Sequence, residues 1–282
     1  MQKIKVFSAV DSVRDAINER KKQGDKIGFV PTMGALHDGH VSLVNEISHR
    51  VDCVVVSIFV NPTQFNNPDD LLKYPRTIER DLTILEQAGV DFVFVPTVEE
   101  VYPPGLVNEK LDIGILGNVM EGSFRPGHFD GVVQVVKRLF DIVEPHVACF
   151  GEKDFQQLAV IRFMTNHYEL PIEIVGCPIK REESGLAMSS RNMRLSAQQK
   201  IDALFIYEIL QFAKSNTNNY SPKDLQTICT EKFTQSNLEL EYLEIISPKT
   251  LVSLTDEWEV GATCCIACYC GEVRLIDNMI LK

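Results

Sequence analysis

Apolar residues gather in short unbroken runs through the first two thirds of the chain, and helical patterns separate these runs. The runs are rich in Val, Ile and Phe, which is typical of strands buried on both faces of a parallel sheet. They cover residues 26–30, 51–60, 91–96, 146–151 and 172–177. The helical patterns cover residues 40–50, 76–88, 130–143 and 154–168. This alternation predicts a doubly wound, Rossmann-like α/β domain, in which ligands bind beyond the carboxyl ends of the strands.

The last third of the chain has a different pattern, two helices followed by three apolar strands. Ser196 and Gln199 form a capping box ahead of a helix to about Lys214, and Ser221-Pro222 begins another. The strands are expected at 238–246, 263–270 and 273–281. We therefore predict two domains: a Rossmann-like domain over 1–180 and a smaller C-terminal α+β domain with antiparallel strands over 181–282.

Charge and composition narrow the range of partners. The chain has 282 residues, with 39 acidic against 28 basic side chains and a formal net charge of −11. This acidic balance disfavours a nucleic-acid partner, but it leaves room for a small anionic ligand bound by a few local cations. The sequence contains no apolar window of the roughly 18 residues that a membrane-spanning helix needs, and its start does not resemble a signal peptide. We expect a cytoplasmic location and no membrane partner.

Half of the eight cysteines fall in one segment, TCCIACYC, with Cys264, Cys265, Cys268 and Cys270. The pair Cys265-x-x-Cys268 has metal-ligand spacing, but no second pair or histidine follows at the distance of a zinc finger. The segment is also apolar enough for a buried strand, in which cysteine serves as a small hydrophobic residue. The buried strand is the favoured interpretation, and metal binding by these cysteines stays open.

The strongest chemical signal is PTMGALHDGH (31–40), directly after the first apolar run. Gly34 and Gly39 permit tight turns and close approach of the backbone to a ligand. His37 and His40 lie three residues apart at the beginning of the next helix, where free N–H groups and the helix dipole attract anions. The alternative is a polar loop with two surface histidines. The alignment of strand, glycines, histidines and helix start favours a phosphate-binding site.

Three other segments carry candidate polar side chains. Lys153 begins a helix, an unfavourable place for a cation unless it binds an anion. Ser189, Ser190 and Arg191 offer two hydroxyls and a guanidinium on a loop, for which a solvated turn is an equal alternative. Gln64 and Gln157 carry neutral amides, which suit a ligand with both hydroxyl and carboxylate groups.

These segments together resemble one family. His-x-Gly-His after the first strand is similar to the motif of the nucleotidyltransferase superfamily. The full string PTMGALHDGH resembles the pantoate–β-alanine ligase family, and other segments agree with it in order: FVNPTQF (59–65), YPRT (74–77), RPGHFDGV (125–132), FGEKDFQQL (150–158), GLAMSSRN (185–192) and RLIDN (274–278). The resemblance covers essentially the whole chain and is densest from 27 to 192.

The resemblance implies an ATP-dependent condensation of (R)-pantoate with β-alanine to pantothenate, a coenzyme A precursor, through pantoyl adenylate, with release of AMP and pyrophosphate. Catalytic roles then fall to His37, His40 and Lys153, and pantoate and β-alanine binding to Gln64 and Gln157. The implied ATP-binding residues are Met33, Gly34, Ala35, Leu36, His37, Asp38, Gly39, His40, Gly151, Glu152, Lys153, Asp154, Lys180, Met188, Ser189, Ser190 and Arg191. Mg²⁺ is expected with the nucleotide, no dedicated metal-ligand set is predicted, and a homodimer is usual in this family.

Some positions depart from the family pattern, and three others are expected to support the site or a metal ion. Thr63 stands where Leu or Met is more common, Gln134 where Thr is common, and Lys180 where an apolar or variable residue contacts adenine through its backbone. Arg125 and His128 are expected to support the site. Asp81 is a candidate magnesium ligand, with a solvated helix residue as the alternative.

The expected reaction has two steps. The pantoate carboxylate attacks the α-phosphorus of ATP, and the β-alanine amine then attacks the acyl carbon of the adenylate. The helix start opposes a permanent positive charge on His40, so its role as hydrogen-bond donor or transient acid stays open. Segment 181–191 is the predicted closing loop that excludes water. The alternatives are another nucleotidyltransferase, such as a cytidylyltransferase, and an ATP-binding regulatory module without catalysis.

Overall fold

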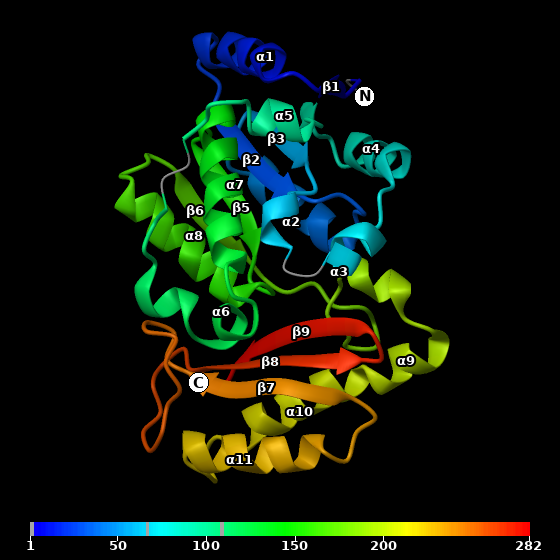
Figure 1. The fold of residues 1–282 in the computed structure, drawn as a ribbon, viewed down its shortest axis with the longest axis vertical. Coiled ribbons are helices and arrows are strands. Elements are labelled where there is room, and N and C mark those ends of the chain that lie inside the picture. The colour runs from blue at the N-terminus through cyan, green and yellow to red at the C-terminus, as the bar shows by residue number, and fades with distance from the viewer. Residues whose placement is uncertain (1–2, 66–67, 108–109) are drawn as a thin grey trace. The chain divides into compact units, whose positions relative to one another are not determined.

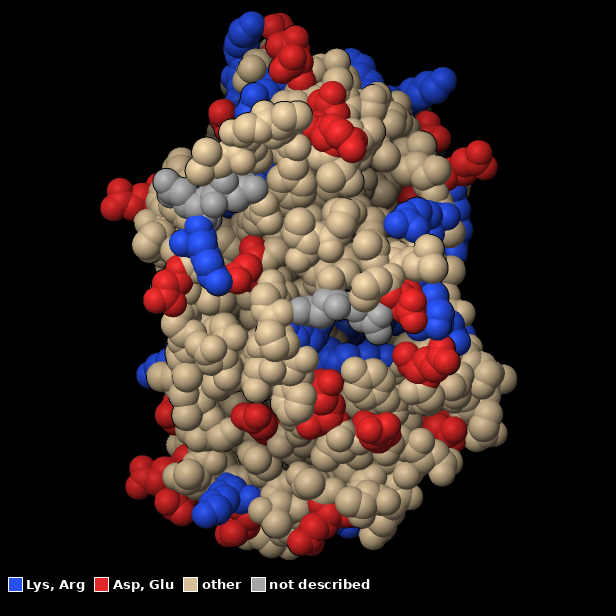
Figure 2. All heavy atoms as spheres, viewed as in Figure 1, with Lys and Arg blue, Asp and Glu red and all other residues tan. Residues whose placement is uncertain are grey.

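The computed structural model describes residues 3–65, 68–107 and 110–282, which form two compact units. The first unit consists of 1–113, 125–152 and 157–178, and the second of 114–124, 153–156 and 179–282. None of the helices described is long and apolar enough to cross a membrane. Acidic side chains lie at many separate places on the face shown in Figure 2, in keeping with the negative net charge.

A parallel sheet forms the first unit (Figure 1). It has six strands in the order β1-β4-β3-β2-β5-β6. The strands are β1 (Lys5–Phe7), β2 (Ile27–Thr32), β3 (Cys53–Ile58), β4 (Phe92–Phe94), β5 (Val147–Gly151) and β6 (Glu173–Cys177). The helices among them are α1 (Val10–Lys22), α2 (Asp38–Ser48), α3 (Pro68–Lys73), α4 (Ile78–Gln87), α5 (Val98–Val101), α7 (His128–Val143) and α8 (Phe155–His167), with a 3-10 turn η1 (Pro62–Gln64). The predicted doubly wound α/β fold is confirmed.

The core explains why the predicted strands read as unbroken apolar runs. Every residue of β3 is buried, and so is all of β2 except Pro31. On one face of the sheet, α2 and α4 pack against β2, β3 and β4 through a shared apolar cluster. Phe140 of α7 contacts the rings of Phe29 and Phe150, which lie on strand positions that alternate with that cluster. A strand covered on both faces needs apolar side chains at every position.

The strand order places a switch point at β2. The chain continues from β2 to β3 on one side and returns later to β5 on the other, and β2 pairs in parallel with both. In doubly wound sheets the ligand crevice lies at the carboxyl end of the strand where the order reverses. The segment that leaves this end of β2 is the predicted phosphate-binding turn, residues 33–40.

The second unit contains a three-stranded antiparallel sheet with helices packed on one face. Its strands, in the order β7-β8-β9, are β7 (Glu239–Ile246), β8 (Thr263–Cys270) and β9 (Val273–Ile280). Its helices and 3-10 turns are η2 (Gly114–Gly117), α6 (Met120–Phe124), η3 (Ser190–Arg194), α9 (Ala197–Asp202), α10 (Leu204–Ser215) and α11 (Pro222–Phe233). The capping box at Ser196 and the cap at Ser221 are confirmed. The helix predicted from 196 to 214 is divided at Ala203 into α9 and α10.

The cysteines of β8 are buried in the strand, as predicted. Cys264, Cys268 and Cys270 join the apolar cluster with α10 and α11, whereas Cys265 occupies the alternate side. Cys265 and Cys268 therefore face opposite sides of the sheet and do not form a chelating pair. Burial raises the pKa of Cys268 to about 12, and it also raises the pKa of Cys264, so these thiols stay protonated near neutral pH.

Two short segments from the middle of the chain belong to the second unit, so the units differ from the predicted division at residue 180. Glu121 of α6 accepts two hydrogen bonds from the Arg274 guanidinium, at 2.7 and 2.8 Å, and a third from the Tyr242 hydroxyl at 2.8 Å. Gln156 donates to the carbonyls of Leu116 and Val119. Burial alone would lower the pKa of Arg274, but its hydrogen bonds to Glu121 and Glu241 raise it. Such long-range pairs give no local signal in the sequence.

The first strand and helix were also absent from the prediction. β1 is three residues long and lies at the edge of the sheet, paired with β4 alone. α1 has a buried stripe of Val10, Val13 and Ile17 at helical spacing. This stripe is a readable helical pattern.

A buried carboxylate fixes the turn after β2. Gly34 and Ala35 both have left-handed backbone, with φ of 80° and 50°. Asp81 of α4, 1% exposed, accepts hydrogen bonds from the backbone N–H groups of Ala35 at 2.9 Å and Leu36 at 2.8 Å, and from the Thr77 hydroxyl at 3.1 Å. Left-handed backbone is unfavourable at alanine, so the carboxylate supplies the interaction that keeps the turn in this shape.

We expect Asp81→Asn to lower the free energy of unfolding by about 2 kcal/mol, because an amide nitrogen would face backbone donors that now meet a carboxylate oxygen. Urea denaturation of the purified protein measures this loss. Glu79→Gln on the exposed side of the same helix is the control and should change stability by less than about 0.5 kcal/mol. Equal midpoints for the two variants would contradict the structural role of Asp81.

Candidate active site

The two histidines form the start of α2. His37 is the N-cap residue, and its Nδ1 accepts a hydrogen bond from the backbone N–H of Gly39 at 3.1 Å. Nδ1 of His40 accepts from the backbone N–H of His37 at 3.3 Å, and the ring centroids are 4.1 Å apart. Because Nδ1 is an acceptor in both rings, the proton of each neutral imidazole is on Nε2. Both Nε2–H groups are thus hydrogen-bond donors at a helix N-terminus, as a phosphate-binding corner requires.

The turn after β3 places Gln64 next to the turn after β2. The Gln64 side-chain nitrogen lies 2.9 Å from the sulfur of Met33. Asn61, fully buried, donates to the carbonyl of Gly131 at 3.1 Å and accepts from the Tyr102 hydroxyl at 3.1 Å. Burial raises the pKa of Tyr102 to about 12, so its hydroxyl remains a donor at neutral pH. The hydrogen bonds of Asn61 therefore fix the turn that carries Gln64.

Thr63, which departs from the family pattern, has a structural role that the pattern did not indicate. Its hydroxyl donates to the side-chain oxygen of Asn61 at 3.1 Å, the same atom that the Tyr102 hydroxyl reaches. Its carbonyl lies against Gly131, where an added Cβ would be 2.5 Å from the oxygen. A side chain at position 131 would push the turn away from α7.

Arg125 and His128 hold Gln64 from the other side through its backbone. His128, 7% exposed, lies with Nδ1 2.8 Å from the Gln64 carbonyl and Nε2 3.1 Å from an Arg125 nitrogen. A guanidinium only donates, so Nε2 of His128 accepts and Nδ1–H donates to the carbonyl. Arg125 and His128 therefore both contact the backbone carbonyl of Gln64, and their supporting role at the site stays a prediction.

The second unit carries the remaining predicted phosphate contacts. The carbonyl of Lys153 accepts from the Asn278 side chain at 3.0 Å, and the Lys153 side chain is partly exposed. Lys180 is exposed, and its carbonyl accepts from the backbone N–H of Met188 at 3.0 Å. Ser189 caps the 3-10 turn η3, with its hydroxyl accepting from the N–H of Arg191 at 3.2 Å. Ser190 is buried and Arg191 is half-buried.

The structure separates the two adjacent glutamines of α8. Gln156 is 3% exposed and is fully engaged with the backbone of segment 114–124, including the N–H of Glu121 at 3.0 Å. Gln157 is only half-buried and belongs to the first unit, the unit that also contains Gln64. The sequence-based choice of Gln157 as the candidate binding residue is compatible with this division.

Among the described residues, no three His, Cys, Asp or Glu side chains are grouped to hold a metal ion. Asp81, the candidate magnesium ligand, has neither of the expected roles, since its oxygens accept three protein hydrogen bonds and it is not solvated.

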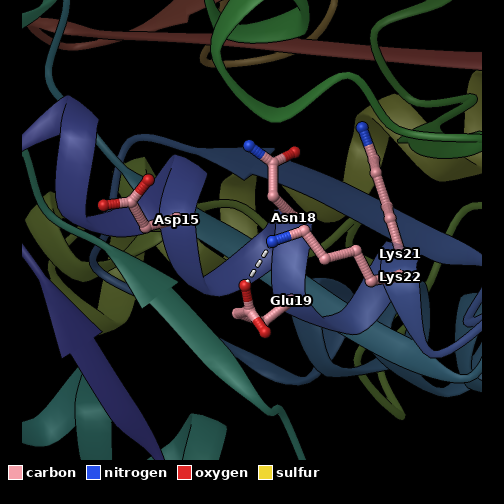
Figure 3. A pocket seen from close by; sticks show the side chains of 5 residues that line it. All are labelled: Asp15, Asn18, Glu19, Lys21 and Lys22. Carbon is pink, nitrogen blue, oxygen red and sulfur yellow. Dashed lines mark hydrogen bonds and ion pairs between the residues drawn. The ribbon is translucent and has the colours of Figure 1, made fainter.

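A surface hollow occurs elsewhere in the first unit, along the last turns of α1. Figure 3 shows its lining residues Asp15, Asn18, Glu19, Lys21 and Lys22, with a hydrogen bond of 2.6 Å joining Lys22 to Glu19. α1 ends shortly before the amino end of β2. The hollow therefore lies at the opposite edge of the sheet from residues 33–40, and we do not assign it to the site.

Comparison with known proteins gives one consistent family. The family model described as pantoate-beta-alanine ligase matches residues 5–280. The chain is 47% identical to the pantothenate synthetase of Bacteroides fragilis, with 99% of both chains covered, and 49% identical to that of Phocaeicola vulgatus, with 99% and 100% covered.

Solved structures agree with this match. The crystal structure of pantothenate synthetase from Thermus thermophilus is similar with a TM-score of 0.93 at 41% identity, covering 99% of each chain. The pantoate-beta-alanine ligase of Francisella tularensis, complexed with beta-gamma ATP and beta-alanine, has a TM-score of 0.84 at 36% identity, covering 98% of this chain and 97% of that one. The chain carries His37 and His40 after β2 and Gln64 after β3, and it is similar to these proteins along its whole length. It therefore belongs to the pantoate–β-alanine ligase family.

Proposed function

We propose that the protein condenses (R)-pantoate with β-alanine at the expense of ATP, through an enzyme-bound pantoyl adenylate. The observation that carries this proposal is the pairing, within one unit, of the two-histidine helix start with a glutamine held beside it at Met33. The helix start offers hydrogen-bond donors for phosphate, and the glutamine amide offers a donor and an acceptor for a hydroxy acid. Both are needed for attack of a carboxylate on the α-phosphorus of ATP.

His37 and His40 act on the phosphates as neutral donors. Their Nδ1 atoms accept backbone hydrogen bonds, so a proton gained there would break the cap of α2. Nε2–H donors fixed at a helix N-terminus stabilise the negative charge that grows on phosphate oxygens in the transition state, without the reorganisation that water would need. We therefore assign them to hydrogen-bond donation in the adenylation step.

Gln64 and Gln157 hold pantoate. An amide binds a hydroxyl and a carboxylate while leaving the carboxylate charge unneutralised, so the nucleophile keeps its reactivity. Arg125 and His128 keep Gln64 in place through its carbonyl. Positioning of two reactants accounts for most of the rate in such transfers, because the protein need not form a covalent bond itself.

Lys153, Ser189, Ser190 and Arg191 supply the charged and hydroxyl contacts to the triphosphate, and the segment around Lys180 receives the adenine. The loop 181–191 protects the acyl adenylate from water until the β-alanine amine attacks its acyl carbon and AMP leaves. The Francisella relative in complex with beta-gamma ATP and beta-alanine supports both ligands for this chain. An Mg²⁺ ion that arrives with ATP would offset part of the phosphate charge.

We also propose a cytoplasmic homodimer as the working form, on the strength of the family resemblance. Sedimentation equilibrium of the purified protein tests the dimer directly.

Incubation of the purified protein with ATP, (R)-pantoate and β-alanine should yield pantothenate, AMP and pyrophosphate in equal amounts, measured by liquid chromatography and mass spectrometry. With β-alanine omitted, pyrophosphate release should still require pantoate, because adenylation precedes amine attack. Pyrophosphate formation with cytidine triphosphate and no pantoate would instead identify another nucleotidyltransferase. ATP binding without any product would identify a regulatory module.

Gln64→Glu should raise the KM for pantoate at least about tenfold, because a carboxylate would face the carboxylate of the substrate. The KM for ATP should change little. Gln87→Glu, an exposed site at the end of α4, is the control for the added charge. Steady-state kinetics of the three proteins decide the point, and an unchanged pantoate KM in Gln64→Glu would remove this residue from the pantoate site.

A further inference from the structure

Strand β9 of the second unit carries two neighbouring buried polar residues that the proposed reaction does not use. Asp277 and Asn278 are each 4% exposed. The Asp277 carboxylate accepts hydrogen bonds from both terminal nitrogens of Arg181, at 2.6 and 3.0 Å. One of its oxygens also accepts a hydrogen bond from the backbone N–H of Asn278 at 2.8 Å. A carboxylate this buried needs such compensation, and the paired guanidinium provides it in bidentate geometry.

Asn278 reaches a different partner. Its side-chain nitrogen donates to the carbonyl of Lys153 at 3.0 Å, and its own carbonyl accepts from Arg181 at 3.3 Å. Two consecutive residues of one strand therefore hold two segments that are far apart in the sequence. One is the turn with Lys153, just before α8, and the other is the base of the 181–191 segment.

Arg181 in turn fixes the shape of that segment. It donates to the carbonyl of Gly185 at 3.1 Å, and its guanidinium lies 4.6 Å above the ring of Tyr207. Gly185 has a φ of 97°, and a Cβ there would lie 2.3 Å from the Tyr207 ring. Arg181 also forms a β-bridge with Ala187, so the chain closes on itself just before Ser189. These contacts fix residues 181–187, the base of the predicted closing loop 181–191.

We propose that Asp277 and Asn278 are positioning residues for ATP: through Arg181 and the Lys153 backbone they set the spacing of the two phosphate-binding segments of the second unit. This inference rests on the proposed function, since it gives Lys153 and residues 189–191 their partner in ATP. The residues act through others and do not touch the substrate. Strand β9 is suited to this task because it is paired along its full length with the central strand β8.

The first test is direct ATP binding without pantoate, by isothermal titration calorimetry. Asn278→Ala should weaken ATP binding about five- to tenfold, which corresponds to the loss of one hydrogen bond that orients a charged contact. Ile209→Val, a small cavity in the same unit, controls for general loss of stability and should leave ATP affinity unchanged.

A double-mutant cycle separates positioning from a merely structural role. If Asn278 acts through Lys153, then Asn278→Ala should weaken binding little further once Lys153→Ala is present. Fully additive losses, or an unchanged affinity in Asn278→Ala alone, would overturn the proposal. Pantothenate formation by the unaltered protein is measured in parallel. Its absence would reject the proposed function, whereas its presence with a normal Asn278→Ala rejects only this inference.

The Arg181–Asp277 pair is tested separately, by the rate of proteolysis in the segment that Arg181 holds. Arg181→Lys keeps the positive charge but loses the bidentate pair and the stack on Tyr207. Cleavage by a glutamate-specific protease at Glu182 and Glu183 should become several times faster in Arg181→Lys, and this variant should also bind ATP more weakly. The cleavage rate is the measurement that tests the pair. It should stay unchanged in Asn278→Ala. Equal cleavage rates in Arg181→Lys and the unaltered protein would show that the pair does not hold this segment.

Discussion

The predicted phosphate-binding turn depends on one buried carboxylate. Asp81 lies on α4, yet its hydrogen bonds go to the backbone of residues 35 and 36, in the turn that follows β2. The turn has left-handed backbone at a glycine and then at an alanine, a conformation that does not persist without support. Once the turn is fixed, His37 caps α2 and His40 bonds back to it, so both imidazoles acquire a defined tautomer. A single charge on a neighbouring helix therefore sets the donor geometry of the site.

Polar groups of the first unit are arranged so that most of its candidate ligand contacts are neutral. Imidazole Nε2–H groups, backbone N–H groups and amides follow the carboxyl ends of β2 and β3, while Arg125 is directed to His128 and the Gln64 carbonyl. Fixed neutral dipoles stabilise a developing anion without quenching a carboxylate nucleophile. The cations proposed for ATP, Lys153 and Arg191, both belong to the second unit.

Patterns in the sequence were sufficient for the parts of the structure that are set locally. The strands of the parallel sheet are buried on both faces, so β3 was visible as an apolar run, and Ser196 and Ser221 indicated their helices by capping. The histidine turn was visible because strand, glycine and helix start coincide. β1 was missed because three residues at a sheet edge leave little pattern. The role of Asp81 was missed because the backbone N–H groups that it binds are 45 and 46 residues away, and the alternatives considered, metal ligand or solvated acid, both assumed an accessible side chain.

The same limit explains why the predicted domain division and the units differ. Glu121 and Gln156 belong to the second unit through pairs with residues distant in the chain, and no local composition change marks segments 114–124 or 153–156. Their placement has a chemical consequence for the site. Segment 153–156 begins with Lys153, so the lysine is anchored to β9 rather than to the strand that precedes it. In a doubly wound sheet the residue after a strand is normally positioned by that strand. Here Asn278 of β9 donates a hydrogen bond to the Lys153 carbonyl, so the backbone of this proposed ATP contact is held by the unit that also carries Ser189, Ser190 and Arg191.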